Sequence, residues 1–341
     1  MPSPEPTAVT GPPADQTLDA LEIRRLALAF NELQAALPFT VWPYFAQSLA
    51  AVTNRLVPEL AGPKLDAYDT RLNLLRREGV VDLGPALDPQ QVAEIRAYFD
   101  SRPCFAAHMA AKSDGKERTV DECAAIGAQG SYRLSDIARA PHLIELANRD
   151  DILTLMENYL GCVPSIYSMN AFWTFPDKPG LIPGLQTYHR DFDDFRFCTM
   201  FFFLTGATPD DGAHRFIRGT HRPDLVQRHL KDREPPESLA PRLDKLFAKV
   251  AAVDDALLES FRPQITTVGG PPGTVVLEDT YGLHKGEPPK SRRLLAWVRY
   301  GLYQNVAHLT DRIAPLPRGA LAGRIPDTPR HRYINRFIVD G

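Results

Sequence analysis

The C-terminal half of the chain is a series of short apolar runs separated by turns. Aromatic and branched residues, which favour strands, fill each run, and glycine, proline and aspartate cluster between the runs. At least six strands are expected, over residues 165–175, 195–204, 212–217, 264–268, 273–277 and 293–303. Proline supplies 31 of the 341 residues, against a usual share of about 5%, which argues against a helical bundle or repeat. These features predict a β-sandwich or barrel core with helices packed outside it.

The N-terminal part follows a helical pattern instead. Leu26, Phe30, Leu33 and Leu37 recur at the spacing of one helix face, and Pro38 ends the stretch. Further helices are expected over about 41–60, 65–77, 89–101, 141–148 and 151–160, with residues 102–131 irregular. The front of the chain is therefore expected to be an α-helical extension.

The expected organisation has three parts. Residues 1–16 are rich in proline, alanine and threonine without periodicity, which predicts a disordered tail. The α-helical extension covers 17–74 and the β domain covers 75–341. A charged, helix-forming insertion at about 224–260 interrupts the β domain.

Charge and cysteine content exclude several classes of protein. With 39 basic and 42 acidic residues the net charge is −3, which predicts no binding to nucleic acid or to an anionic membrane. The chain has no apolar stretch near ~20 residues, and its first residues lack the pattern of a signal peptide. Cys104, Cys123, Cys162 and Cys198 are too widely spaced for a CxxC pair, so free buried thiols are expected. We therefore expect a soluble, cytoplasmic protein.

The segment YHRDFDD, residues 188–194, carries the first chemical signal. On a strand, residues i and i+2 point to the same face, so His189 and Asp191 project together. With one distant histidine they would form a 2-His-1-carboxylate triad, which leaves coordination positions open and suits non-haem Fe(II). Chance or a structural ion pair also explains such a motif when it stands alone.

A later segment supplies the missing groups. His284 follows a short strand and offers a third ligand, and Arg293 begins an apolar strand nine residues later. A guanidinium can hold a carboxylate with two parallel hydrogen bonds, which a lysine cannot reproduce. The combined pattern is the arrangement needed to bind Fe(II) and the distal carboxylate of 2-oxoglutarate.

Taken together, these segments resemble the phytanoyl-CoA dioxygenase family of Fe(II)/2-oxoglutarate-dependent oxygenases. The resemblance covers about residues 75–310 and rests on three blocks, 188–197, 212–222 and 278–286. It implies a mainly β fold with flanking helices, built on a double-stranded β-helix (jelly-roll or cupin-like) core. Departures from the usual family residues, at 204–207, Ala213 and Thr274, lie in turns away from the ligand motifs.

The resemblance also implies roles for individual residues. His189, Asp191 and His284 would be the iron ligands, and Arg293 would bind 2-oxoglutarate. Arg292 is the alternative, because a register slip of one residue would place it on the inner face instead.

Other side chains near these motifs have several interpretations. Asn170, Thr199 and Phe201 are expected to line the cosubstrate pocket. His214 is either structural or faces the substrate, and His221 is expected to make a structural hydrogen bond.

Three charged residues also have open roles. Arg299 either reaches substrate or cosubstrate or makes a salt bridge. Asp193 and Asp194 are more plausible as solvated turn acids than as partners that orient His189.

The expected reaction is hydroxylation of a C–H bond in a small metabolite or natural product, with molecular oxygen consumed and succinate and CO2 released. Desaturation or cyclisation by the same centre, and a catalytically silent cupin-like metal-binding module, are the alternatives. Halogenation is disfavoured, because Asp191 occupies the position that halogenases of this fold leave open for chloride. A homo-oligomer formed through the N-terminal helices is a further possibility.

Overall fold

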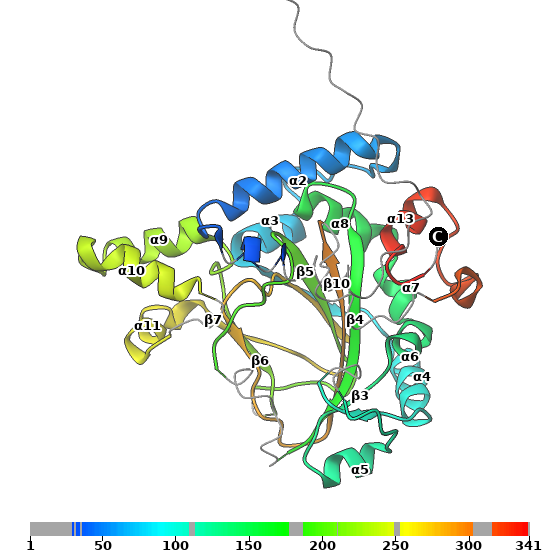
Figure 1. The fold of residues 1–341 in the computed structure, drawn as a ribbon. Coiled ribbons are helices and arrows are strands. Elements are labelled where there is room, and N and C mark those ends of the chain that lie inside the picture. Colours follow the sequence, from blue (N-terminus) through cyan, green and yellow to red (C-terminus); the bar gives the residue numbers. More distant parts are fainter. Residues whose placement is uncertain are drawn as a thin grey trace, which may run out of the picture.

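The core of the computed structural model consists of two antiparallel sheets packed face to face (Figure 1). The structure describes residues 29–30, 32–34, 36–108, 113–176, 187–209, 211–248, 253–302 and 316–339. The larger sheet has the order β1-β8-β5-β10-β4-β3-β2 and the smaller has the order β7-β6-β9. Their bounds are β1 Val80–Pro85, β2 Phe105–Ala106, β3 Gly130–Ser131, β4 Ser165–Thr174, β5 Phe197–Phe203, β6 His214–Ile217, β7 Ile265–Val268, β8 Thr274–Glu278, β9 His284–Lys285 and β10 Arg293–Gly301. The two sheets confirm the expected jelly-roll-like core.

Alternation along the strands separates an inner face from an outer face. In β10, Leu295 and Trp297 belong to the apolar cluster between the sheets, whereas Leu294 and Ala296 belong to the outer cluster. The inner cluster draws on both sheets: Phe172, Phe201, Phe203, Ala207, Ala213, Phe216, Val268, Val276, Leu295 and Trp297. Arg293 and Arg299 share the parity of the inward residues. Polar groups on odd-numbered positions of β10 are therefore directed into the space between the sheets.

Helices cover the outer face of the larger sheet (Figure 1). These are α3 Thr70–Glu78, α4 Pro89–Asp100, α6 Leu134–Arg139, α7 Leu143–Ala147, α8 Asp150–Leu160 and α13 Pro329–Asn335. The start of α4 follows from its sequence: Asp88 and Gln91 form a reciprocal capping box, with Pro89 in the first turn. Gly161 ends α8 in a left-handed conformation, φ 93°. None of the helices in the described ranges has the length and apolar character of a membrane span.

The N-terminal extension packs on the sheets through α2, Trp42–Leu56, which crosses one end of the larger sheet (Figure 1). The expected helix 41–60 is interrupted at Val57 and continues as a short 3-10 helix, Pro58–Leu60. The helix expected to begin at 65 begins at Thr70, because Asp69 caps it by accepting a hydrogen bond from the Leu72 amide. Most of the helix expected over 17–37, and the tail 1–16, lie outside the described residues. The boundary near residue 75 stays a prediction.

Residues 102–131, expected to be irregular, contain β2, β3 and α5, Val120–Ala125. That prediction was wrong, because two-residue strands carry no periodicity and a helix of six residues shows almost none. The Thr119–Glu122 capping box was the one local sign of α5. All four cysteines are buried as free thiols.

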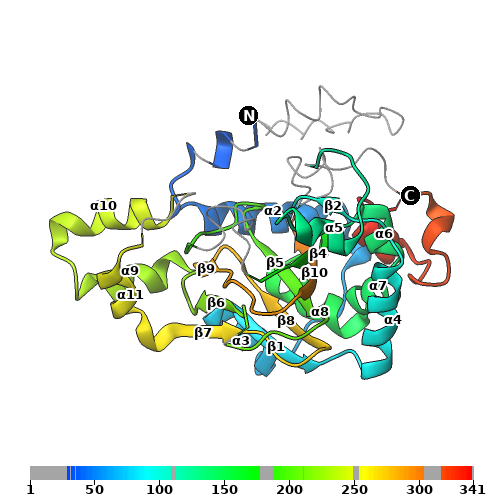
Figure 2. The ribbon, with the colours of Figure 1, turned by 90° about the horizontal axis from the view of Figure 1, so that it is seen from below.

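The charged segment expected to be helical forms three helices, α9 Pro223–Lys231, α10 Pro236–Leu246 and α11 Asp255–Ser260. Figure 2 shows them gathered beside β7, at the opposite end of the molecule from α4, α6 and α7. Two further 3-10 helices, Arg262–Gln264 and Arg318–Leu321, complete the described elements.

Candidate functional site

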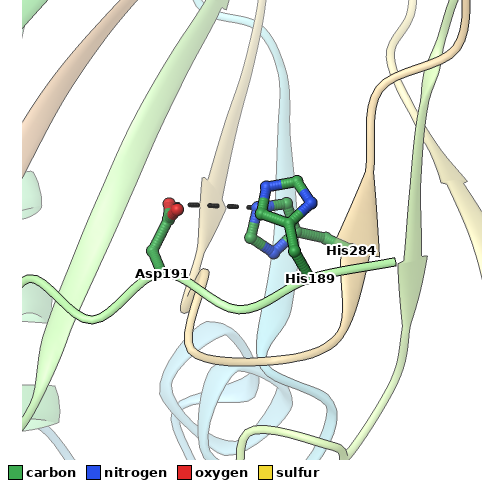
Figure 3. A group of neighbouring side chains, drawn as sticks. All are labelled: His189, Asp191 and His284. Carbon is green, nitrogen blue, oxygen red and sulfur yellow. Dashed lines mark ion pairs between the residues drawn. The ribbon is translucent and has the colours of Figure 1, made fainter. Parts of the chain in front are cut away.

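Backbone hydrogen bonds join the two segments that carry His189, Asp191 and His284. His189 and His284 exchange their amide hydrogen bonds, at 2.9 and 3.0 Å, and the Asp191 amide donates to the Thr280 carbonyl at 2.9 Å. The His189–His284 pairing is an isolated bridge, so the expected strand geometry holds only at that point. One ligand atom from each of the three side chains lies within 4.8 Å of the other two (Figure 3). The structure thus brings together side chains from two segments that lie more than 90 residues apart in the sequence.

The two imidazoles expose the same ring nitrogen to the space between them. His189 Nδ1 lies 2.9 Å from the Thr187 carbonyl and His284 Nδ1 lies 2.9 Å from the Gly282 carbonyl. A carbonyl only accepts, so each Nδ1 donates and each Nε2 keeps its lone pair. Burial lowers the pKa of His284 to about 4, so the ring is neutral at physiological pH. Both rings are therefore oriented to ligate a metal through Nε2.

Arg299 connects Asp191 to a second acid. Its guanidinium donates to Asp191 Oδ2 at 2.7 Å and also to Asp193, which accepts from the Tyr167 hydroxyl at 3.1 Å. Burial raises the pKa of Asp191, but Arg299 and His284 lower it further, so it lies below its usual value. Of the two interpretations of Arg299, the structure shows the salt bridge. Asp193 and Asp194 are buried, so the interpretation as solvated turn acids was wrong.

Arg190, between the two residues of the HxD motif, points away from them and anchors the turn. Its Nε donates to the Leu246 carbonyl at 2.9 Å, and Nη1 donates to the carbonyls of Thr220 and Tyr281 at 2.7 and 2.5 Å. The guanidinium also lies over the Phe247 ring, 4.1 Å from its centroid. The buried side chain thus holds the ligand-bearing turn against three other segments.

His214 and Glu278 lie next to the triad. His214 Nε2 is 3.0 Å from Glu278 Oε1, and the His214 and His284 rings are nearly parallel with centroids 5.0 Å apart. Burial raises the pKa of Glu278 to about 8 and lowers the pKa of His214 to about 3. Sequence reasoning missed Glu278. The available signal was an acid at an inward position of the apolar strand β8.

Of Arg292 and Arg293, Arg293 is the one that faces the interior. It is 7% exposed, and its Nε has no hydrogen-bond partner among the described residues. Burial lowers the pKa of Arg293 to about 10, so the guanidinium stays charged at neutral pH. Arg292, in contrast, is half-exposed and donates to Asp121 at 2.5 Å on the outside. Of these two arginines, Arg293 is the one directed into the space between the sheets.

The three expected pocket residues line the inner face with different partners. Phe201 belongs to the inner cluster, 5.6 Å from the His214 ring. Thr199 Oγ1 lies 3.3 Å from Thr280 Oγ1, and the Asn170 amide donates to the His108 carbonyl at 2.9 Å. Asn170 is therefore engaged with the segment that follows β2.

His108, in that segment, lies against the inner face. The His108 ring lies 4.9 Å from the Phe172 ring, and its Nδ1 is 3.1 Å from Gln129 Oε1. The sequence around His108 does not predict this placement, because nothing local to it shows that β2 and β3 extend the larger sheet beside β4.

The donor atoms fit a non-haem iron centre with 2-oxoglutarate. Two imidazoles and one carboxylate leave coordination positions free, which suits Fe(II). The buried Arg293, with its unpaired Nε, suits a carboxylate.

Comparisons with known proteins agree with this chemistry. A family model described as Phytanoyl-CoA dioxygenase (PhyH) matches residues 75–294. The comparison with curated proteins found no match.

Several solved structures are similar at low sequence identity. AviO1 from Streptomyces viridochromogenes Tue57 is 17% identical over 70% of this chain and 96% of its own, with a TM-score of 0.39. The non-heme alpha ketoglutarate dependent carbocyclase SnoK from nogalamycin biosynthesis is 17% identical over 70% of this chain and 87% of its own, with a TM-score of 0.43. HygX from Streptomyces hygroscopicus, with nickel and 2-oxoglutarate bound, is 14% identical over 69% and 87%, with a TM-score of 0.43.

Proposed function

Because the chain belongs to the phytanoyl-CoA dioxygenase family of Fe(II)- and 2-oxoglutarate-dependent oxygenases, we propose that it hydroxylates a C–H bond of a small-molecule substrate. The substrate is a metabolite or natural product, molecular oxygen is consumed, and succinate and CO2 are released. The family supplies the cofactor and the class of reaction. The roles of individual residues, and hydroxylation in particular, are our proposal.

The observation that carries the proposal is the convergence of His189, Asp191 and His284. One ligand atom from each lies within 4.8 Å of the others, and both rings keep Nε2 free because Nδ1 donates to a carbonyl. These three side chains would hold Fe(II), which supplies the activation of oxygen. Arg299 would keep the Asp191 carboxylate ionised and oriented through the bond at 2.7 Å.

Arg293 would hold the distal carboxylate of 2-oxoglutarate. A buried guanidinium without an ion-pair partner in the described part of the chain is costly, and a carboxylate from the cosubstrate would offset that cost. Phe201 and Thr199 would form the neighbouring wall, with Asn170 holding the segment at His108 in place.

Hydroxylation is preferred over halogenation, desaturation and cyclisation, and over a catalytically silent metal-binding module. The carboxylate ligand Asp191 is present, which argues against chloride binding at that position. Desaturation and cyclisation would use the same centre, and no described residue favours them. A catalytically silent module is at odds with membership of an oxygenase family.

The test measures succinate release in three single variants and product mass in the wild-type reaction. His189→Ala, Asp191→Ala and His284→Ala should each abolish 2-oxoglutarate-dependent succinate release. The wild-type protein, incubated with pools of candidate substrates, should give a product that is heavier than its substrate by one oxygen atom. Circular dichroism verifies that each variant folds, and His229→Ala, a histidine in the insertion that contacts Ser260, serves as the control. Full succinate release by any of the three ligand variants would contradict the assignment.

A further inference from the structure

A second set of two histidines and one carboxylate lies beside the proposed iron ligands. His214, Glu278 and His284 each place a ligand atom within 4.8 Å of the other two. His284 belongs to both sets, whereas His214 and Glu278 have no role in the proposed reaction.

The second set joins the two sheets. His214 begins β6 and His284 begins β9, two paired strands of the smaller sheet, while Glu278 ends β8 in the larger sheet. The Glu278 side chain is fully buried, and those of His214 and His284 are 15% and 5% exposed. Neighbouring strands therefore hold the three donors at fixed positions in the interior.

The carboxylates of the two sets differ in their partners. Asp191 is paired with the Arg299 guanidinium. Glu278 has no cationic Lys or Arg partner in the described ranges, and its Oε2 is buried with no hydrogen bond there. A buried carboxyl oxygen without a hydrogen-bond partner is costly, and a bound cation would satisfy it.

The two sets cannot be used at the same time. His284 Nδ1 donates to the Gly282 carbonyl, so only Nε2 is available, and one imidazole nitrogen serves one cation. A tetrahedral zinc ion with ligands at about 2.1 Å needs donor atoms roughly 3.4 Å apart. The His214 Nε2 and Glu278 Oε1 atoms, 3.0 Å apart, are already close to this spacing, and small movements of these side chains and of His284 would complete it.

We propose that His214, Glu278 and His284 form an alternative site for a divalent cation of the zinc class, which competes with the proposed iron site for His284. The inference rests on the proposed function only in the role given to His284. It predicts that removal of the Asp191 carboxylate redirects a cation to the second set and does not abolish cation binding.

Cobalt(II) alone, titrated anaerobically into the full chain, tests the proposal because its visible spectrum reports the ligand set. Asp191→Ala should bind one Co²⁺ per chain with a spectrum different from that of the wild type. Adding Glu278→Gln should raise the Kd for Co²⁺ by about tenfold or more, since a carboxylate ligand is lost. His214→Gln in the same background should give a similar loss.

The matched control is Asp191→Ala/Asp279→Asn. Asp279 is the next residue after Glu278 and is also buried, but it is bound to the Tyr159 hydroxyl outside the second set. This control should keep the Kd of Asp191→Ala within about twofold. Thermal melting of each variant verifies that it is folded.

Two outcomes would overturn the proposal. One is an equal Kd for Co²⁺ in folded Asp191→Ala with and without Glu278→Gln or His214→Gln. The other is no cobalt binding by Asp191→Ala where the wild type binds one ion. The proposed function is tested separately by the charge-transfer band of wild-type protein with Fe(II) and 2-oxoglutarate, so the two failures are distinguishable.

Discussion

Arg293 shows how one step along a strand separates a buried side chain from a surface one. Arg293 pairs with Thr174 in the β10–β4 ladder and faces inward, while Arg292 precedes the strand and binds Asp121 outside. The sequence could not choose between them, because both precede the same apolar run. The choice depends on the register of β10 against β4, which is a property of the sheet.

We therefore expect Arg293→Lys to weaken 2-oxoglutarate binding by about tenfold to a hundredfold, about 1.4–2.8 kcal/mol, because the two-pronged contact is lost. Arg292→Lys is the matched control and should leave the affinity nearly unchanged. The Kd for 2-oxoglutarate of each variant is measured by anaerobic titration of the Fe(II)-loaded protein, followed by the visible charge-transfer band of the Fe(II)–2-oxoglutarate chelate. A strong effect at Arg292 with none at Arg293 would exchange their roles.

Asp279 makes the free energy of unfolding depend on pH, and the sign of this dependence follows from the burial of its side chain. Burial raises the pKa of Asp279 to about 6, although the Tyr159 hydroxyl and the Tyr281 amide both donate to it. The folded state thus binds more protons than the unfolded state between about pH 4 and 6. The stabilising contribution of Asp279 is therefore fully present below the pKa that its carboxyl has in the unfolded chain. It is lost as the pH rises through the pKa that the carboxyl has in the folded chain.

Asp279→Asn should remove this dependence. Relative to the wild type, its free energy of unfolding should be lower near pH 4 and should recover by on the order of 3 kcal/mol as pH rises past 6. Urea unfolding across this pH range is the measurement. Asp82→Asn, at an exposed acid on β1, should follow the wild-type curve, and an identical curve for Asp279→Asn would contradict the explanation.

Among elements, α2 shows the clearest division between a packed face and a free one. Trp42 is 3% exposed and stacks on Tyr281 with ring centroids 5.0 Å apart. Tyr44, two residues later, is 71% exposed. Because Tyr281 lies within the chain segment between Thr280 and His284, α2 packs directly behind the candidate site.

Trp42→Ala should destabilise the protein by about 3–5 kcal/mol, the usual cost of emptying a buried aromatic site. Tyr44→Ala should change stability by less than about 0.5 kcal/mol, because it removes an exposed ring from the same helix. Denaturant unfolding measures both. Comparable losses from the two substitutions would show that the packing of α2 is misassigned.

Elements with a strong local pattern could be predicted, and the others could not. The expected helix 151–160 corresponds to α8 and the expected strand 165–175 corresponds to β4, each within a residue or so at either end. The two-residue strands β2 and β3 exist only through pairing with each other and with β4. Their position over the inner face, and that of His108, therefore depends on contacts distant in sequence.

At the scale of the whole molecule, the resemblance predicted the jelly-roll-like fold, and the proximity of His189, Asp191 and His284 followed from it. The pairing of Asp191 and Asp193 with Arg299 did not, because it requires three segments to meet. A cytoplasmic location and an oligomer through the N-terminal helices stay predictions.

Metal and cosubstrate should stabilise the folded chain as a whole, because they bind the native site and not the unfolded chain. With both present anaerobically at a hundredfold excess over Kd, the expected gain is about 2.7 kcal/mol per ligand, visible as a Tm higher by a few degrees. A chelator should reverse it, and His284→Ala, which removes a ligand shared by both sets, should show no gain. An equal rise in Tm for His284→Ala would place the metal elsewhere.

The anchoring of Arg190 has a consequence for how such a chain tolerates change over evolution. All three of its hydrogen-bond acceptors are main-chain carbonyls, from Leu246, Thr220 and Tyr281. A substitution at any of these positions alters a side chain and leaves the carbonyl in place. The exposed positions of the helical insertion are thus free to diverge in sequence, and with them the surface it presents. The buried Phe247 ring under Arg190 and the turn that carries His189 and Asp191 keep their positions.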